Sequence, residues 1–219
     1  MAGAAARRPA AGARVLSARR ATPLAALALV LAGAALGGHG LYLRAKAVLA
    51  QLLLERAFAA SLASGRPARA WPWEDTWPIA RLAFPRLGRS AIVLAEGGGE
   101  ALAFGPAHVA ATPRPGEPGT SVIAGHRDTH FHFLAELAPG DELTLTAADG
   151  RARRFQVTGA ALVHADASGI EPAGAEPRLA LVTCWSPDGL HRSPLRYVVF
   201  AREVRAALTP ARAPRPAAP

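Results

Sequence analysis

The N-terminal third of the chain follows helical periodicity, and the remainder does not. Residues 22–43 carry no charged side chain and consist mainly of Ala, Leu, Val and Gly. A run of about 22 such residues is long enough to cross a bilayer core as a helix. Apolar residues continue at helical spacing from Leu49 to Phe58, and Gly65 ends the pattern. We therefore expect one membrane-spanning helix followed by a juxtamembrane helix or stalk.

From residue 79 onward, the pattern changes to short apolar runs separated by Gly and Pro. Seven runs have strand character: 79–84, 90–94, 120–124, 141–146, 153–163, 179–183 and 195–202. Short strands at this spacing predict a single all-β barrel or sandwich. Residues 131–137 favour one short helix. The residues after 205 are rich in Pro, Ala and Arg, which is typical of a disordered tail.

The net charge of +9 is concentrated at the two ends of the chain. Five arginines precede the apolar run, whereas only Arg44 and Lys46 closely follow it, which predicts that the N-terminus lies inside. Residues 71–200 contain eleven arginines against fourteen acids, so a basic nucleic-acid groove is not expected. A signal peptide has a shorter apolar core, which favours a retained anchor, although the Ala-rich sequence leaves cleavage as an alternative.

Three residues at the ends of strand-like runs combine into a candidate active site. Cys184 is the only cysteine, and it follows an apolar run and opens a loop containing Pro and Gly. A lone thiol in an exported chain is either inert or kept for its chemistry. His126 also follows a run, and Arg196 begins the last one. A thiol nucleophile needs an imidazole partner, and a guanidinium can stabilise the oxyanion of a tetrahedral intermediate.

The segments around these residues resemble the sortase family of cysteine transpeptidases. They are AGHRDTHF at 124–131, LVTC at 181–184 and LRYVV at 195–199. The likeness runs from about Trp71 to Arg202. The fuller histidine segment, the N-terminal anchor and the sequence WPWED at 71–75 are most similar to the proteobacterial subfamily called class GN sortases.

The resemblance implies an eight-stranded β-barrel with short helices and no cofactor. Cys184 would attack a Leu-Pro-x-Thr-like sorting signal near the C-terminus of an exported protein, and an amine would then take the acyl group. His126 would act as general acid and then base, Arg196 would hold the oxyanion, and Thr183 would support the nucleophile. We divide the chain into a cytoplasmic tail (1–21), a transmembrane anchor (22–43), a stalk (44–70), an extracytoplasmic catalytic domain (71–205) and a tail (206–219).

Several alternatives remain open at this point. A hydrolase could use the same three residues, and a non-enzymatic anchored β-domain would instead hold Cys184 buried and unreactive. Arg192 rivals Arg196 for the oxyanion, and Asp128 could orient His126 or pair with Arg127. Glu136, Asp141 and Glu142 are a candidate calcium cluster, although three acids near a turn are more typical of a solvated edge. The cysteine and histidines lack the paired spacing of a zinc site, so no metal is expected.

Overall fold

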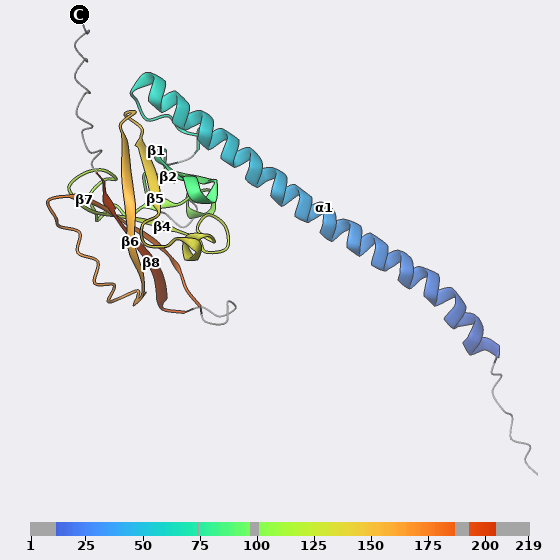
Figure 1. Ribbon diagram of the computed structural model, residues 1–219. Coiled ribbons are helices and arrows are strands. Elements are labelled where there is room, and N and C mark those ends of the chain that lie inside the picture. Colours follow the sequence, from blue (N-terminus) through green and yellow to red (C-terminus); the bar gives the residue numbers. More distant parts are fainter. Residues whose placement is uncertain (1–11, 74, 97–100, 187–192, 205–219) are drawn as a thin grey trace, which may run out of the picture. The chain divides into compact units, whose positions relative to one another are not determined.

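The computed structural model describes residues 12–73, 75–96, 101–186 and 193–204, with residues 12–22 and 24 as backbone only (Figure 1). Predicted features at Arg192 and in the tail after residue 204 therefore lie outside the described residues. The chain divides into two compact units, one ending at Leu49 and the other beginning at Ala50. Each unit is described by itself.

One α-helix, α1 (Gly12–Ser64), covers both the predicted membrane span and the predicted stalk. Within the first unit, the large apolar side chains from Leu27 to Leu43 are all more than half exposed. Such a surface is unfavourable in water and suits a lipid environment. The segment Ala25–Ser64 is long and apolar enough to cross a membrane, judged by length and composition alone.

The last turns of α1 belong to the second unit and pack on its β-strands. Leu54 and Phe58 lie one helical turn apart and are almost fully buried. Their buried partners are Ile92, Leu94, Ala101 and Ala107. Arg81 forms an ion pair with Glu55, and its guanidinium carbon lies 5.2 Å from the ring centroid of Phe58. The helix is thus fixed to the β-domain by a small apolar core and by one arginine.

The helix ends where the sequence predicts. Gly65 adopts the left-handed conformation with φ 65°, and its N–H donates to the carbonyl of Ser61 at 2.9 Å. The second compact unit begins at Ala50. It includes the last turns of α1, because their apolar stripe is covered by the β-domain. The predicted boundary of the catalytic domain at residue 71 stays a prediction.

The second unit contains a closed eight-stranded barrel, which confirms the predicted fold (Figure 1). Its strands are β1 (Pro78–Phe84), β2 (Arg89–Leu94), β3 (Ala107–His108), β4 (Gly119–Gly125), β5 (Glu142–Ala147), β6 (Ala152–His164), β7 (Pro177–Cys184) and β8 (Leu195–Glu203). Their order around the barrel is β1-β2-β3-β4-β7-β8-β6-β5, and β5 pairs with β1 to close it. All seven predicted strands are present, whereas β3 is too short to produce a sequence pattern.

Three short 3-10 helices complete the described elements: η1 (Pro85–Leu87), η2 (Ala101–Ala103) and η3 (Leu134–Glu136). The short helix predicted over residues 131–137 is reduced to η3. Phe131 and Phe133 are instead buried in the barrel core, where their rings pack edge to face with a centroid distance of 6.4 Å. Tertiary packing of these rings outweighs the local preference for a longer helix.

The barrel core determines which side chains of the central strands face outward. Leu179 and Leu181 of β7 and Val199 of β8 belong to the main core and are fully buried. Because side chains alternate along a strand, the even-numbered residues of these strands point away from this core, although Ala180 and Val198 are buried as well. Cys184 and Arg196 are therefore on the outer face of the barrel, while Thr183 faces inward.

Candidate active site

The three predicted catalytic residues lie in one row across adjacent strands. Strands β4 and β7 are parallel neighbours, and Gly125 pairs with Thr183 at the end of their ladder. His126 and Cys184 each follow directly, so their backbones are about one strand spacing apart, roughly 4.8 Å. On the other side of β7, Cys184 pairs with Arg196 of β8 in the antiparallel register. The barrel therefore brings together His126, Cys184 and Arg196, which are up to 70 positions apart in the sequence.

The thiol and the imidazole are accessible at this end of the barrel. Both Cys184 and His126 are exposed, although Cys184 is the last residue of a strand whose other end is in the core. At the end of a rigid strand, the backbone is held in place while the side chain stays accessible to a substrate, as a nucleophile requires. The exposure contradicts the buried thiol that a non-enzymatic domain would have.

Thr183 ties the strand of the cysteine to the strand of the histidine. Its side chain is buried, and its hydroxyl donates a hydrogen bond of 2.8 Å to the carbonyl of Gly125. This bond joins Thr183, which immediately precedes Cys184, to Gly125, which immediately precedes His126. It fixes their relative position at the point where the ladder of β4 and β7 ends.

Phe131 packs under the loop that follows β4 and begins at His126, from the side of the barrel core. A Cβ atom at position 125 would lie 2.7 Å from the Phe131 ring, so only glycine lets the ring approach β4 this closely. The backbone N–H of Phe131 also donates to the carbonyl of His126 at 3.0 Å. The loop after β4 therefore turns back on itself around a buried aromatic ring, which places His126 at its start.

Arg196 is partly held by the backbone of its own strand. One guanidinium nitrogen, Nη1, donates to the carbonyls of Ser193 at 3.1 Å and Leu195 at 2.9 Å. Among the described residues, no carboxylate forms an ion pair with this guanidinium. The backbone N–H of Trp185 donates to the carbonyl of Leu195. The rings of Trp185 and Tyr197 pack at a centroid distance of 5.5 Å. Both contacts stiffen the start of β8.

The remaining polar residues near His126 have partners of their own. The Asp128 carboxylate accepts from Nε of Arg127 at 2.8 Å, and its side chain is 80% exposed. Its predicted support of His126 stays a prediction. His132 contacts the carbonyl of Thr129 through Nδ1 at 2.7 Å. Burial lowers the pKa of His130, which favours its neutral form.

The carboxylate of Asp141, one member of the candidate calcium cluster, is occupied by an arginine. It accepts two hydrogen bonds from Arg86, at 2.6 and 2.7 Å, and one from the backbone of Ala138 at 2.8 Å. The hydrogen bond from Arg86 lowers the pKa of Asp141. The guanidinium supplies the positive charge that a cation would otherwise bring, and it fixes η1 to the start of β5.

An apolar groove of about 290 Å³ lies beside the row of His126, Cys184 and Arg196, on the outer face of the barrel. Arg196 lines one part of it, and most of the other lining side chains are apolar. They include Val109, Val122, Val163, Ile170, Val182 and Val198. The sequence pattern did not reveal this groove, because one wall comes from the irregular segment between β6 and β7 that contains Ile170 and Pro172.

Comparison with known proteins agrees with this geometry. The Sortase domain family matches residues 82–204, more than half of the chain. Sortase D of Bacillus subtilis (strain 168) is 27% identical over 124 residues, which cover 56% of this chain and 62% of that protein. The chain thus spans less than two thirds of this curated relative.

Solved structures resemble the barrel at low sequence identity. Sortase A from Corynebacterium diphtheriae has a TM-score of 0.55 at 18% identity, over 73% of this chain and 86% of that one. Streptococcus agalactiae sortase C1 has a TM-score of 0.54 at 22% identity, over 74% and 89% of the two chains. These likenesses show the fold, and the domain match shows the family. The chain belongs to the sortase family.

Proposed function

We propose that this protein is a cysteine transpeptidase that cleaves a sorting signal through a thioester acyl-enzyme. The observation that carries the proposal is the strand register, which aligns His126, Cys184 and Arg196 in one row on the outer face of the barrel. Membership of the sortase family supports the same reaction. In this proposal each of the three residues has a separate task.

In the first step, the Cys184 thiolate attacks the backbone carbonyl of the substrate. A bond forms between Sγ and the carbonyl carbon, and the carbonyl oxygen becomes an oxyanion that Arg196 stabilises with its free guanidinium N–H groups. The C–N bond then breaks, and His126 donates its proton to the leaving amine. The products are a thioester on Cys184 and the released C-terminal fragment.

In the second step, an amine replaces the thiol. His126 removes a proton as the incoming nitrogen attacks the thioester carbonyl, a new C–N bond forms, and the C–S bond breaks to restore the Cys184 thiolate. Water attacking the same thioester would give hydrolysis instead. The acyl-enzyme is common to both outcomes, so a hydrolase is the second candidate function.

The apolar groove is where we place the sorting signal. Its Val and Ile side chains offer an apolar surface next to Arg196, which suits the Leu-Pro part of a Leu-Pro-x-Thr-like signal. Binding there would bring the following peptide bond to the catalytic row. The substrate would be an exported protein with this signal near its C-terminus, and the acceptor would be an amine of a second molecule.

The apolar part of α1 suits a single-pass anchor in the cytoplasmic membrane. The arginines before residue 22 favour an N-terminus inside, which would leave the catalytic barrel on the extracytoplasmic side. The histidine segment supports assignment to the class GN sortases. That assignment implies one dedicated substrate protein.

Cleavage of a labelled Leu-Pro-x-Thr peptide by the full chain in detergent tests this function. Without added amine, we expect slow hydrolysis. With hydroxylamine or a glycine peptide, we expect the ligated product detected by mass spectrometry. Cleavage with no ligated product at any amine concentration would favour the hydrolase. No cleavage and a thiol that resists alkylation would contradict both enzymatic functions.

A further inference from the structure

The apolar groove has a floor and two walls. The floor consists of valines on three neighbouring strands, namely Val122, Val182 and Val198. One wall includes Val109 and Thr112, from the segment between β3 and β4. The other wall includes Ile170 and Pro172, from the segment between β6 and β7. Neither segment is part of a β-strand of the barrel, so the width of the groove depends on the contacts that hold them.

Thr112 closes its wall as a tight turn and ties it to the floor. Its backbone N–H and its hydroxyl both donate to the carbonyl of Val109, at 2.9 and 2.7 Å. The hydroxyl oxygen also accepts from the backbone N–H of Val122 at 3.1 Å, and the N–H of Val109 donates to the Val122 carbonyl at 2.9 Å. These bonds hold the wall against the middle of β4.

A buried histidine lies behind this wall. His108, the last residue of β3, is only 5% exposed, and it is not one of the described residues that line the groove. Its Nε2 lies 3.1 Å from the carbonyl oxygen of Thr112, 3.0 Å from that of Pro113 and 3.2 Å from the Thr112 hydroxyl oxygen. Carbonyl oxygens only accept, so Nε2 carries a proton and is the donor. One imidazole N–H is thus shared by the two carbonyls at the end of the wall.

The end of this wall meets the opposite wall at Gly119. A Cβ atom at position 119 would clash with the carbonyl oxygen of Pro172 and would lie 2.8 Å from Cγ of Pro113. Gly119 also has φ 104°, which favours glycine. Pro172 is held by a hydrogen bond of 2.8 Å from the Thr120 N–H to its carbonyl. The separation of the two walls at this end therefore depends on Pro113, whose carbonyl is bound by His108.

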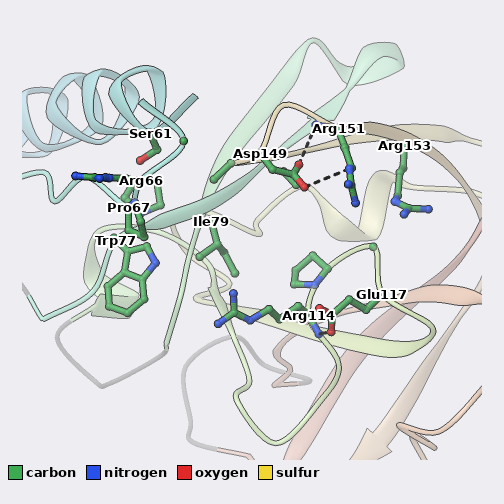
Figure 2. A pocket seen from close by; sticks show the side chains of 16 residues that line it. Ser61, Arg66, Pro67, Trp77, Ile79, Arg114, Glu117, Asp149, Arg151 and Arg153 are labelled. Carbon is green, nitrogen blue, oxygen red and sulfur yellow. Dashed lines mark hydrogen bonds and ion pairs between the residues drawn. The ribbon is translucent and has the colours of Figure 1, made fainter. Parts of the chain in front are cut away.

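The rest of the segment before β4 is held independently of His108. Residues 114–117 form a turn that is closed by a bond from the Glu117 N–H to the Arg114 carbonyl at 2.9 Å, and the Glu117 carboxylate accepts from the Arg114 N–H at 3.1 Å. Figure 2 shows both side chains on this turn, which lines a second cavity of about 450 Å³. Loss of the His108 contacts should therefore loosen residues 109–113 and leave this turn in place.

We propose that His108 is a positioning residue that holds one wall of the groove and thereby sets the affinity for the sorting signal. The inference rests on the proposed function, because it takes the groove as the place where the signal binds. His108 touches neither the bound peptide nor Cys184 in this proposal. Its loss leaves the carbonyls of Thr112 and Pro113 without their donor, which favours a rearranged wall. Binding of the peptide should therefore weaken while the chemistry at Cys184 is preserved.

Peptide cleavage kinetics and hydrogen exchange of the full chain in detergent test this inference. His108→Phe keeps an aromatic ring but lacks the N–H, whereas the amide of His108→Gln can donate to both carbonyls. We expect His108→Phe to raise KM at least about fivefold with kcat within about twofold of the wild type. His108→Gln should stay close to the wild type. The amides of residues 109–112 should exchange faster in His108→Phe, whereas those of residues 165–171 in the opposite wall should not change.

Three kinetic or exchange results would overturn the inference. They are unchanged KM and exchange in folded His108→Phe, a fall in kcat without a change in KM, and equal impairment by phenylalanine and glutamine. If the wild type cleaves no signal peptide, the proposed function fails, and the exchange rates still decide whether His108 holds the wall.

A measurement on the wild type keeps the test decisive if His108→Phe does not fold. Nitrogen NMR of the chain labelled with ¹⁵N-histidine should show His108 protonated at Nε2, with its signal assigned by its absence from His108→Gln. A neutral ring protonated only at Nδ1 would overturn the inference, because Nε2 could not then donate to the wall.

Discussion

Replacing Thr183 by valine should separate catalysis from folding at this site. Valine has nearly the same shape but removes the hydroxyl that donates to the Gly125 carbonyl at 2.8 Å. Thr183 is 4% exposed, so water cannot easily replace the lost donor. Losing one hydrogen bond of this kind costs about 0.5–1.5 kcal/mol of folding free energy. We expect Thr183→Val to lower the free energy of unfolding by that amount.

The catalytic effect should be larger than the stability effect. The lost bond joins the residues before His126 and Cys184, and a misplacement of about 1 Å between reacting groups can reduce the rate roughly 100-fold. We expect kcat to fall strongly with little change in KM. Thr183→Ser keeps the hydroxyl and is the matched control, with kcat near that of the wild type.

Steady-state kinetics on one peptide, together with thermal unfolding of each variant, provide the measurement. The reasoning would be refuted if Thr183→Val kept kcat within about twofold of the wild type. It would also be refuted if serine and valine lowered kcat equally, because the hydroxyl would then be irrelevant.

Three further predictions follow from the same structure. Arg196→Lys should lose about 2.7–4 kcal/mol of transition-state stabilisation, and Arg192→Ala much less; the reverse order in kcat/KM would assign the oxyanion to Arg192. A chain shortened to begin at Ala50 should stay folded. A chain that begins at Trp71 lacks the buried side chains of Leu54 and Phe58, so its free energy of unfolding should be lower by roughly 3–6 kcal/mol. Equal melting temperatures of the two shortened chains would contradict this. Asp141→Asn should destabilise the protein at neutral pH, and the difference should vanish as the pH falls below the lowered pKa of Asp141; a constant difference would refute the ion pair.

The pH dependence of the Asp141 prediction follows from the direction of its pKa shift. The carboxyl has a lower pKa in the folded protein than its ordinary value of 3.8, because Arg86 stabilises the charged form. Its contribution is therefore complete above the ordinary value and is lost as the pH falls through the folded-state pKa. Urea unfolding of both proteins across this acidic range measures the effect.

The sequence predicted the strands, and it predicted that the three candidate residues lie at strand ends, because both features depend on local patterns. Alternating apolar runs identified seven strands, and the ends of three of them carried Cys184, His126 and Arg196. The register that aligns those ends is a property of the closed barrel, so it could not be derived from the runs alone. The family resemblance supplied what the periodicity left open, namely a barrel rather than a sandwich.

Features built from distant or irregular segments escaped prediction. The docking of Leu54 and Phe58 on the barrel was missed because an amphipathic helix does not identify the surface that covers it. The pairing of Arg86 with Asp141 joins residues 55 positions apart. A cavity of about 450 Å³ is lined by the end of α1, the start of β1, the loop before β4 and the β5–β6 hairpin, and these segments share no sequence motif.

The most direct test of the account is to trap the acyl-enzyme on Cys184. The full chain in detergent is mixed with a panel of C-terminal signal peptides, quenched in acid and analysed by intact-mass and peptide-level mass spectrometry. We predict an adduct on Cys184 with the mass of the N-terminal peptide fragment, released by hydroxylamine and absent from folded Cys184→Ala. Peptide cleavage that persists undiminished in Cys184→Ala, with no adduct in the wild type, would contradict the central claim.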